Sequence, residues 1–394
     1  MKTKNLKNLK KYLSLSFLII IFLVSYLYQI ISFPSKNRLF NQNDISHNYH
    51  NVSIIFKNSY FLFYNLIGYA IISVKHNPNL FLLRIPSLLV ALAIVVITYR
   101  ILRNWHGNYI AFVGTLLIIS SAFMLHLGRI ELNLINFLLI IPIILLVKIL
   151  TATSISNTRL YVSLALLSMV ILIPGGIFFV ILFIYFSKKN LLTLVKNKIN
   201  FKKIVLTILT GFYWFPLVVY SYLNNHSSYQ SFIDIDIFSW RNFMHLSDIL
   251  LPIKELFFSG INNQNIWLPG TPLFNGFMLI IFIFGLIYYF RNLTASRSKL
   301  LLSSLLVSYV LDIFNNNFIF LLISLVFFIS ITGLANLLVI WFKNFPLNKV
   351  ARSVGYVLIT ILVLVAVYYN YRSYFIVWKY NNNTIALFDL KSKN

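Results

Sequence analysis

The sequence predicts an all-α polytopic membrane protein with about eleven transmembrane helices and its N-terminus inside. Hydrophobic residues make up 59% of the 394 residues and charged residues only 10%, and the mean hydropathy is +0.82. Apolar runs of about 17–25 residues, the length that crosses a bilayer, recur along almost the whole chain. Lys and Arg gather in the short segments between these runs. A soluble domain carries about 25% charged residues, so this class is excluded.

The expected spans follow one another with short polar connections. They are 12–32, 80–100, 109–127, 132–149, 160–173, 176–187, 204–223, 274–290, 299–314, 318–342 and 352–371. The basic N-terminus precedes the first run, and no small-residue cleavage site follows it, so we interpret it as a retained signal anchor. Segment 59–74 is apolar and aromatic, but its roughly 16 residues are short for a span. We expect it to lie at the outer interface or to dip into it.

Charge sets the orientation. Most of the 33 Lys and Arg residues fall in segments that this topology places inside, as the positive-inside rule requires. Counting 59–74 as a span would reverse the basic stretch 188–203, so we reject it. We assign the net charge of +25 to these loops and to anionic lipid head groups, not to nucleic acid.

The same topology leaves every acidic residue outside or near the outer end of a span. These residues are Asp44, Glu131, Asp234, Asp236, Asp248, Glu255, Asp312 and Asp389. Any chemistry is therefore expected on the outer face.

The chain is expected to form a single transmembrane domain, 1–375, followed by a short outer C-terminal tail, 376–394. Two outer loops are long, 33–79 and 224–273, whereas the inner loops are short. No clear internal repeat is present, which argues against a secondary transporter. The absence of cysteine excludes disulfides, thiol nucleophiles and Cys-based metal sites.

The block 80–140 carries three motifs in a recognisable order. They are Arg84-Ile85-Pro86-Ser87, Arg103-Asn104-Trp105-His106-Gly107 and Gly128-Arg129-Ile130-Glu131. This order resembles the GT-C glycosyltransferases, polytopic enzymes that include the dolichyl-phosphate-mannose–protein mannosyltransferases and the lipid A aminoarabinose transferases. The likeness extends more weakly over about 10–375, through Ile173-Pro174-Gly175-Gly176 and Trp267-Leu268-Pro269-Gly270-Thr271-Pro272.

The resemblance implies transfer of a hexosyl or pentosyl group from a polyprenyl-phosphate or polyprenyl-diphosphate donor. The acceptor would be a protein, lipid or glycan of the cell envelope. The enzyme would be a multi-pass protein of the cell membrane with an extracytoplasmic active face, in contact with membrane lipids. It would have no nucleic-acid partner.

Glycosyl transfer needs a base for the acceptor and cations for the departing phosphate. The family carries an Asp, often Asp-Glu, early in the first outer loop. Asp44 is the only carboxylate there, and Ile45 stands in place of the second acid. We expect Asp44 to be the base, although it could instead cap the following turn. Glu131 could orient the acceptor or a metal as a second acid, or form a local ion pair or helix-start charge.

Three outer basic residues are candidates for binding the donor phosphate: Arg84, Arg129 and Lys254. Arg can hold phosphate oxygens in a two-pronged fork. The alternative for the two arginines is that they snorkel to lipid head groups.

Four further residues are accessory candidates, and one more acid, Asp312, is notable for its position. His47 and His50 could relay protons or join a metal site, or simply be polar surface. Asp234 and Asp236 form an Asp-x-Asp pattern, which binds divalent metals in enzymes that use nucleotide sugars. Asp312 lies near hydrocarbon depth, where an acid is either functional or snorkels to the interface. No motif requires a cofactor, and a divalent Mg²⁺ or Mn²⁺ ion is left open.

Two other functions stay open. The missing second acid favours a non-catalytic membrane scaffold or binding protein on the same architecture. A lipid or polysaccharide transporter would place charges on mid-span faces, and the sequence has almost none there.

Overall fold

The computed structural model describes residues 2–28, 62–74, 80–130, 133–152, 157–195, 246–261, 267–268, 270–314 and 318–387. These residues form helices and turns with no strand among them, which confirms the all-α prediction for this part of the chain. Four helical segments are long and apolar enough to cross a membrane, judged by length and composition. They are Ile85–His106, Leu134–Thr151, Ile319–Asn344 and Lys349–Trp378. Their presence supports association with a membrane.

The helices follow the expected order. The first half of the chain contains α1 (Lys2–Leu27), α4 (Leu62–Val74), α5 (Leu80–Leu83), α6 (Ile85–His106), α7 (Asn108–Ser120), α8 (Ala122–Leu127), η1 (Asn133–Asn136), α9 (Phe137–Ala152), α10 (Asn157–Ile171) and α11 (Gly176–Val195). The second half contains α15 (Leu246–Lys254), η3 (Glu255–Ser259), α16 (Gly276–Arg291), α17 (Ser296–Phe314), α18 (Ile319–Asn344), α19 (Lys349–Arg372), η5 (Ser373–Trp378) and α20 (Asn382–Leu387). Every expected span overlaps a helix except 204–223, which lies outside the described residues.

Two helix boundaries differ from the expected spans for local reasons. The expected span 80–100 begins as a separate short helix, α5, and α6 starts only at Ile85, because Pro86 stands in its first turn. The expected span 109–127 is broken at Ser121, whose backbone is extended (φ −61°, ψ 130°). The Ser121 side chain accepts a hydrogen bond from the Met124 backbone N–H at 3.3 Å and so caps α8.

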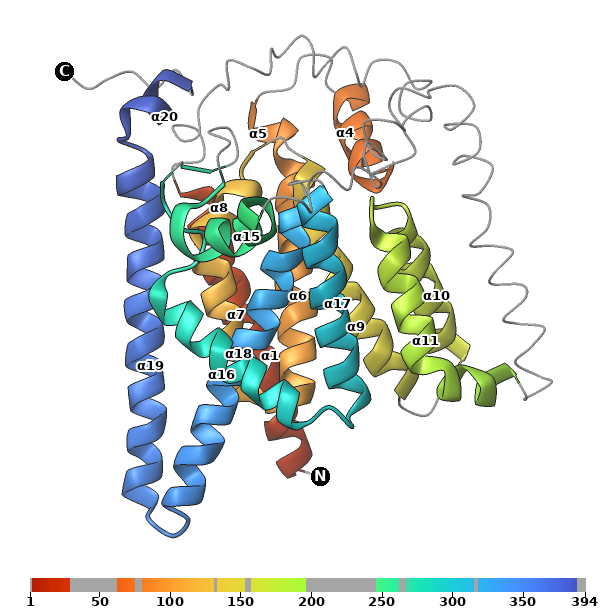
Figure 1. The fold of residues 1–394 in the computed structure, drawn as a ribbon, viewed down its shortest axis with the longest axis vertical. Coiled ribbons are helices and arrows are strands. Elements are labelled where there is room, and N and C mark those ends of the chain that lie inside the picture. The colour runs from red at the N-terminus through yellow and green to blue at the C-terminus, as the bar shows by residue number, and fades with distance from the viewer. Residues whose placement is uncertain are drawn as a thin grey trace.

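The bundle has two ends that differ in charge. We call the end with α4, α5, α8, α15 and α20 the upper end; α1 begins at the lower end, where the α16–α17 and α18–α19 turns also lie (Figure 1). The three acids in the described part of the chain, Asp248, Glu255 and Asp312, all belong to the upper end. Basic side chains crowd the lower end: Arg100, Arg103, Lys148, Arg159, Lys188, Arg291, Arg297, Lys299, Lys343, Lys349 and Arg352. Five described basic residues also belong to the upper end: Arg84, Arg129, Lys254, Arg372 and Lys379.

Helix α18 runs through the centre of the bundle and is buried along most of its length. It packs most closely against α16, where two glycines let the backbones approach. A Cβ atom on Gly333 would lie 2.1 Å from the Ile281 carbonyl oxygen, and one on Gly285 would lie 2.0 Å from that of Ile329. Small residues at such crossings are typical of helices that pack within membranes.

One arginine joins four helices near the lower end. The guanidinium carbon of Arg297, on α17, lies 3.9 Å from the centre of the Trp105 ring on α6. The same guanidinium donates to the Tyr289 hydroxyl on α16 at 2.9 Å and to the Thr332 hydroxyl on α18 at 3.3 Å. The cation–π contact and the two hydrogen bonds of Arg297 hold these four helices in a fixed arrangement.

Candidate functional site

The entry to α6 is tied to two other parts of the upper end. Arg84 precedes this helix as its N-cap residue and its side chain is only 2% exposed. One turn later, the Ser87 hydroxyl donates to the Ile130 carbonyl oxygen at 2.7 Å. The same hydroxyl lies 2.8 Å from the hydroxyl of Tyr64 on α4. These two contacts hold α4 and the chain that follows α8 against the start of α6. Helix α4 covers residues 62–74 of the segment that the sequence places at the outer interface.

Arg129 is fully buried directly after α8, at 0% exposure. Its Nη2 atom donates to the backbone carbonyl of Tyr28 at the end of α1, at 2.7 Å. Its guanidinium carbon lies 5.4 Å from the centre of the Tyr374 ring and 5.1 Å from that of Phe375, both on η5. Arg129 therefore sits between the end of α1 and η5, with its charge facing two aromatic rings.

The two arginines lie close enough to affect each other. Burial lowers the pKa of the Arg129 guanidinium, Tyr374 opposes that shift, and the positive charge of Arg84 lowers the pKa further. Both guanidinium groups also interact electrostatically with the Tyr374 hydroxyl. Arginine stays protonated under such conditions, so two positive charges are buried side by side. Snorkelling to lipid head groups is thus wrong for both residues, because neither side chain reaches the surface.

Aromatic rings pack against one another at this end of the bundle, and we call the rings of Tyr26, His126, Trp267, Tyr374, Phe375 and Trp378 the aromatic wall. The His126 ring on α8 lies 4.0 Å from that of Trp378, and the Trp378 ring lies 5.0 Å from that of Trp267. Tyr26 is fully buried, and a Cβ atom on Gly128 would lie 2.2 Å from the Tyr26 ring. The guanidinium of Arg129 is fully buried beside the Tyr374 and Phe375 rings, and its separation from water strengthens its electrostatic interactions.

Sequence reasoning missed most of this wall. Tyr374 and Phe375 stand in an aromatic run at the end of the last apolar segment, where an interfacial belt is the ordinary interpretation. Trp378 falls in the segment 376–394 that the sequence assigns to the tail, yet it is buried and belongs to η5. The clustering of Tyr371, Tyr374, Phe375 and Trp378 at one-turn spacing is the signal that could have indicated a packed face.

A second buried cluster at the upper end is acidic. Glu255 and Asp312 are 3% and 5% exposed, and their carboxylates lie near enough to repel each other. Asp312 is thus buried in protein and does not snorkel to the interface. Nearby, the Tyr309 hydroxyl donates to the Ile249 carbonyl oxygen and joins α17 to α15. No sequence pattern indicates that these two acids lie close together, because they come from distant segments.

The remaining candidates are not part of the arginine pair. Lys254 lies at the end of α15 with an exposed side chain, so it does not share the buried position of the two arginines. The other six candidates fall outside the described residues: Asp44, Glu131, His47, His50, Asp234 and Asp236. Among the residues that are described, no group of three or more His, Asp or Glu could hold a metal ion.

The structure thus brings two of the predicted phosphate-binding residues, Arg84 and Arg129, together at the upper end. Arg offers paired donors that suit carboxylate or phosphate oxygens. No protein-family model and no curated protein matches the chain. The resemblance to GT-C glycosyltransferases accordingly rests on the motifs in the sequence.

Proposed function

We propose that the chain is a glycosyltransferase of GT-C type. It moves a sugar from a polyprenyl-phosphate-linked donor to a cell-envelope acceptor at the outer face of the membrane. The buried pair of Arg84 and Arg129 carries this proposal, because these residues belong to two of the motifs on which the resemblance rests. A lipid-linked phosphate is the anion that such a pair at one end of a helical bundle would suit.

The proposed reaction is a single displacement. An acceptor hydroxyl attacks the anomeric carbon of the sugar, and the bond from that carbon to the phosphate oxygen breaks. The acceptor proton passes to the Asp44 carboxylate, and the polyprenyl phosphate leaves with the bonding electron pair. Arg84 and Arg129 neutralise the charge that develops on the departing phosphate. Glu131, directly after Ile130 in the chain, would orient the acceptor, and the aromatic wall would keep water from the donor.

The proposed topology has about eleven spans, with the lower end inside and the upper end outside. It is supported by the excess of Lys and Arg at the lower end and by the three acids at the upper end. A donor attached to a membrane lipid would approach the upper end from the outer leaflet. The exposed Lys254, at the same end, would meet its phosphate first.

The proposal is tested by glycosyl transfer with the purified protein and a panel of polyprenyl-phosphate sugars, comparing wild type with Asp44→Asn. Because a general base acts in the transition state, we expect its loss to lower the transfer rate about 10²–10⁴-fold. Donor binding should be unchanged, since Asn keeps the size of the side chain. An unchanged rate would move the base to Glu131 or to the pair Asp234 and Asp236. No turnover with any donor would favour a non-catalytic scaffold.

A further inference from the structure

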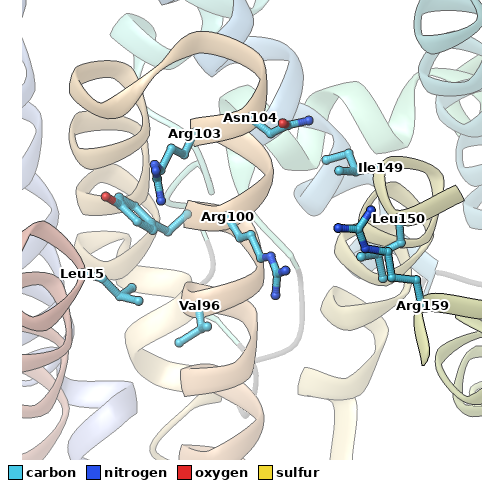
Figure 2. Close-up of a pocket in the computed structure, with 9 residues that line it drawn as sticks. Leu15, Val96, Arg100, Arg103, Asn104, Ile149, Leu150 and Arg159 are labelled. Atoms are coloured by element: carbon cyan, nitrogen blue, oxygen red, sulfur yellow. The ribbon is translucent and has the colours of Figure 1, made fainter. Parts of the chain in front are cut away.

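A cavity of about 580 Å³ opens at the lower end, between α1, α6, α9 and α10. Arg100 and Arg103 line it from α6, and Arg159 lines it from the start of α10. Figure 2 shows Arg100 and Arg159 extending toward one another from opposite sides of the space. The cavity lies at the opposite end of the bundle from the arginine pair of the proposed transferase site.

The lining combines three arginine side chains with several apolar ones. No carboxylate from the described residues lines the cavity, and the three acids in that part of the chain belong to the upper end. Apolar side chains from two helices that flank it, Leu15 on α1 and Leu150 on α9, continue its wall together with Val96 on α6. A ligand that fits both parts has an anionic group joined to a hydrocarbon chain.

We propose that this cavity binds the phosphate head group of an anionic membrane phospholipid. Arg100, Arg103 and Arg159 hold the phosphate, while an acyl chain runs along Leu15 and Leu150. Basic pockets between membrane helices on the positive side of a protein are suited to anionic head groups. The apolar wall favours a lipid over free inorganic phosphate. This inference does not rest on the transferase proposal.

The test is native mass spectrometry of the full-length protein in detergent, titrated with phosphatidylglycerol, with phosphatidylcholine of the same acyl chains, or with inorganic phosphate. We expect one phosphatidylglycerol to bind more tightly than phosphatidylcholine. Arg100→Gln with Arg159→Gln should weaken this binding about tenfold or more, because each cation near an anionic lipid contributes to its affinity. The matched control is Arg291→Gln with Arg352→Gln, which removes the same charge from two exposed lower-end sites outside the cavity.

Three results would overturn the proposal. Equal affinity for phosphatidylglycerol and phosphatidylcholine would show that the net negative charge of the lipid does not contribute to binding. An equal loss in the control variant would show that binding follows the total charge of the lower end and not this cavity. Full displacement of phosphatidylglycerol by millimolar inorganic phosphate would assign the site to a soluble anion. Helix content from circular dichroism and elution as a single species establish that each variant is folded, and Arg100→Lys with Arg159→Lys should retain most of the binding.

Discussion

Under the proposed function, replacement of Arg129 by Gln is expected to lower the rate of sugar transfer about 10²–10³-fold, as the loss of a preorganised donor to developing charge does in known enzymes. The guanidinium of Arg129 is fully buried and faces the Tyr374 and Phe375 rings. Water could therefore not take the place of the lost guanidinium beside the departing phosphate. Arg84→Gln should have an effect of the same order. The measurement is the single-turnover rate with a saturating lipid-linked donor.

Controls separate this catalytic effect from a loss of folding. Arg372→Gln removes an exposed arginine at the same end and should leave the rate unchanged. Arg129→Lys keeps the charge but not the two-pronged geometry, so its rate should fall between those of wild type and Arg129→Gln. If Arg129→Gln melts at the wild-type temperature and transfers sugar at the wild-type rate, the pair does not bind the leaving group.

Gly333→Val is expected to prevent stable packing of α16 against α18. The first side-chain atom would meet the Ile281 carbonyl oxygen at 2.1 Å, and that oxygen belongs to a helix backbone that cannot move alone. Overpacking of this kind costs about 3 kcal/mol or more, a large part of the stability of an ordinary domain. Detergent-solubilised Gly333→Val should therefore elute largely as aggregate, with a melting temperature well below that of the wild type.

The matched control for this prediction is Gly276→Val at the start of α16. A Cβ atom there meets no other atom within 4 Å, so the protein should elute and melt close to the wild type. A normally folded Gly333→Val protein would mean that the two helices do not approach as closely as these distances require.

The helices were largely predictable from the sequence because each one depends on a continuous apolar run. The start of α6 follows from Pro86, which stands in its first turn and can be read directly. The break at Ser121 was not predictable, because Ser is compatible with a helix interior when its neighbours are apolar. Its extended backbone is selected by packing around α8, which no local pattern records.

The candidate site was only partly predictable for the same reason. Arg84 and Arg129 could each be placed near an outer span end, but their proximity depends on how α6, α8 and η5 pack. Tyr374 has the composition of an interfacial residue, and only the tertiary structure places it over a buried cation. Whether Asp44 joins these residues stays a prediction, since it lies outside the described part of the chain.

The most direct test of the account measures which end of the protein transfers sugar when it is reconstituted in proteoliposomes. The chain has no cysteine, so Tyr380→Cys, at a side chain that is 60% exposed at the upper end, gives one thiol for a membrane-impermeant maleimide. Labelling from outside reports the fraction of molecules whose upper end faces outward. A water-soluble short-chain polyprenyl-phosphate sugar is then added to the outside only, together with an acceptor. The account predicts that product forms in proportion to the labelled fraction. Product in proportion to the unlabelled fraction would place the chemistry at the lower end and contradict the account.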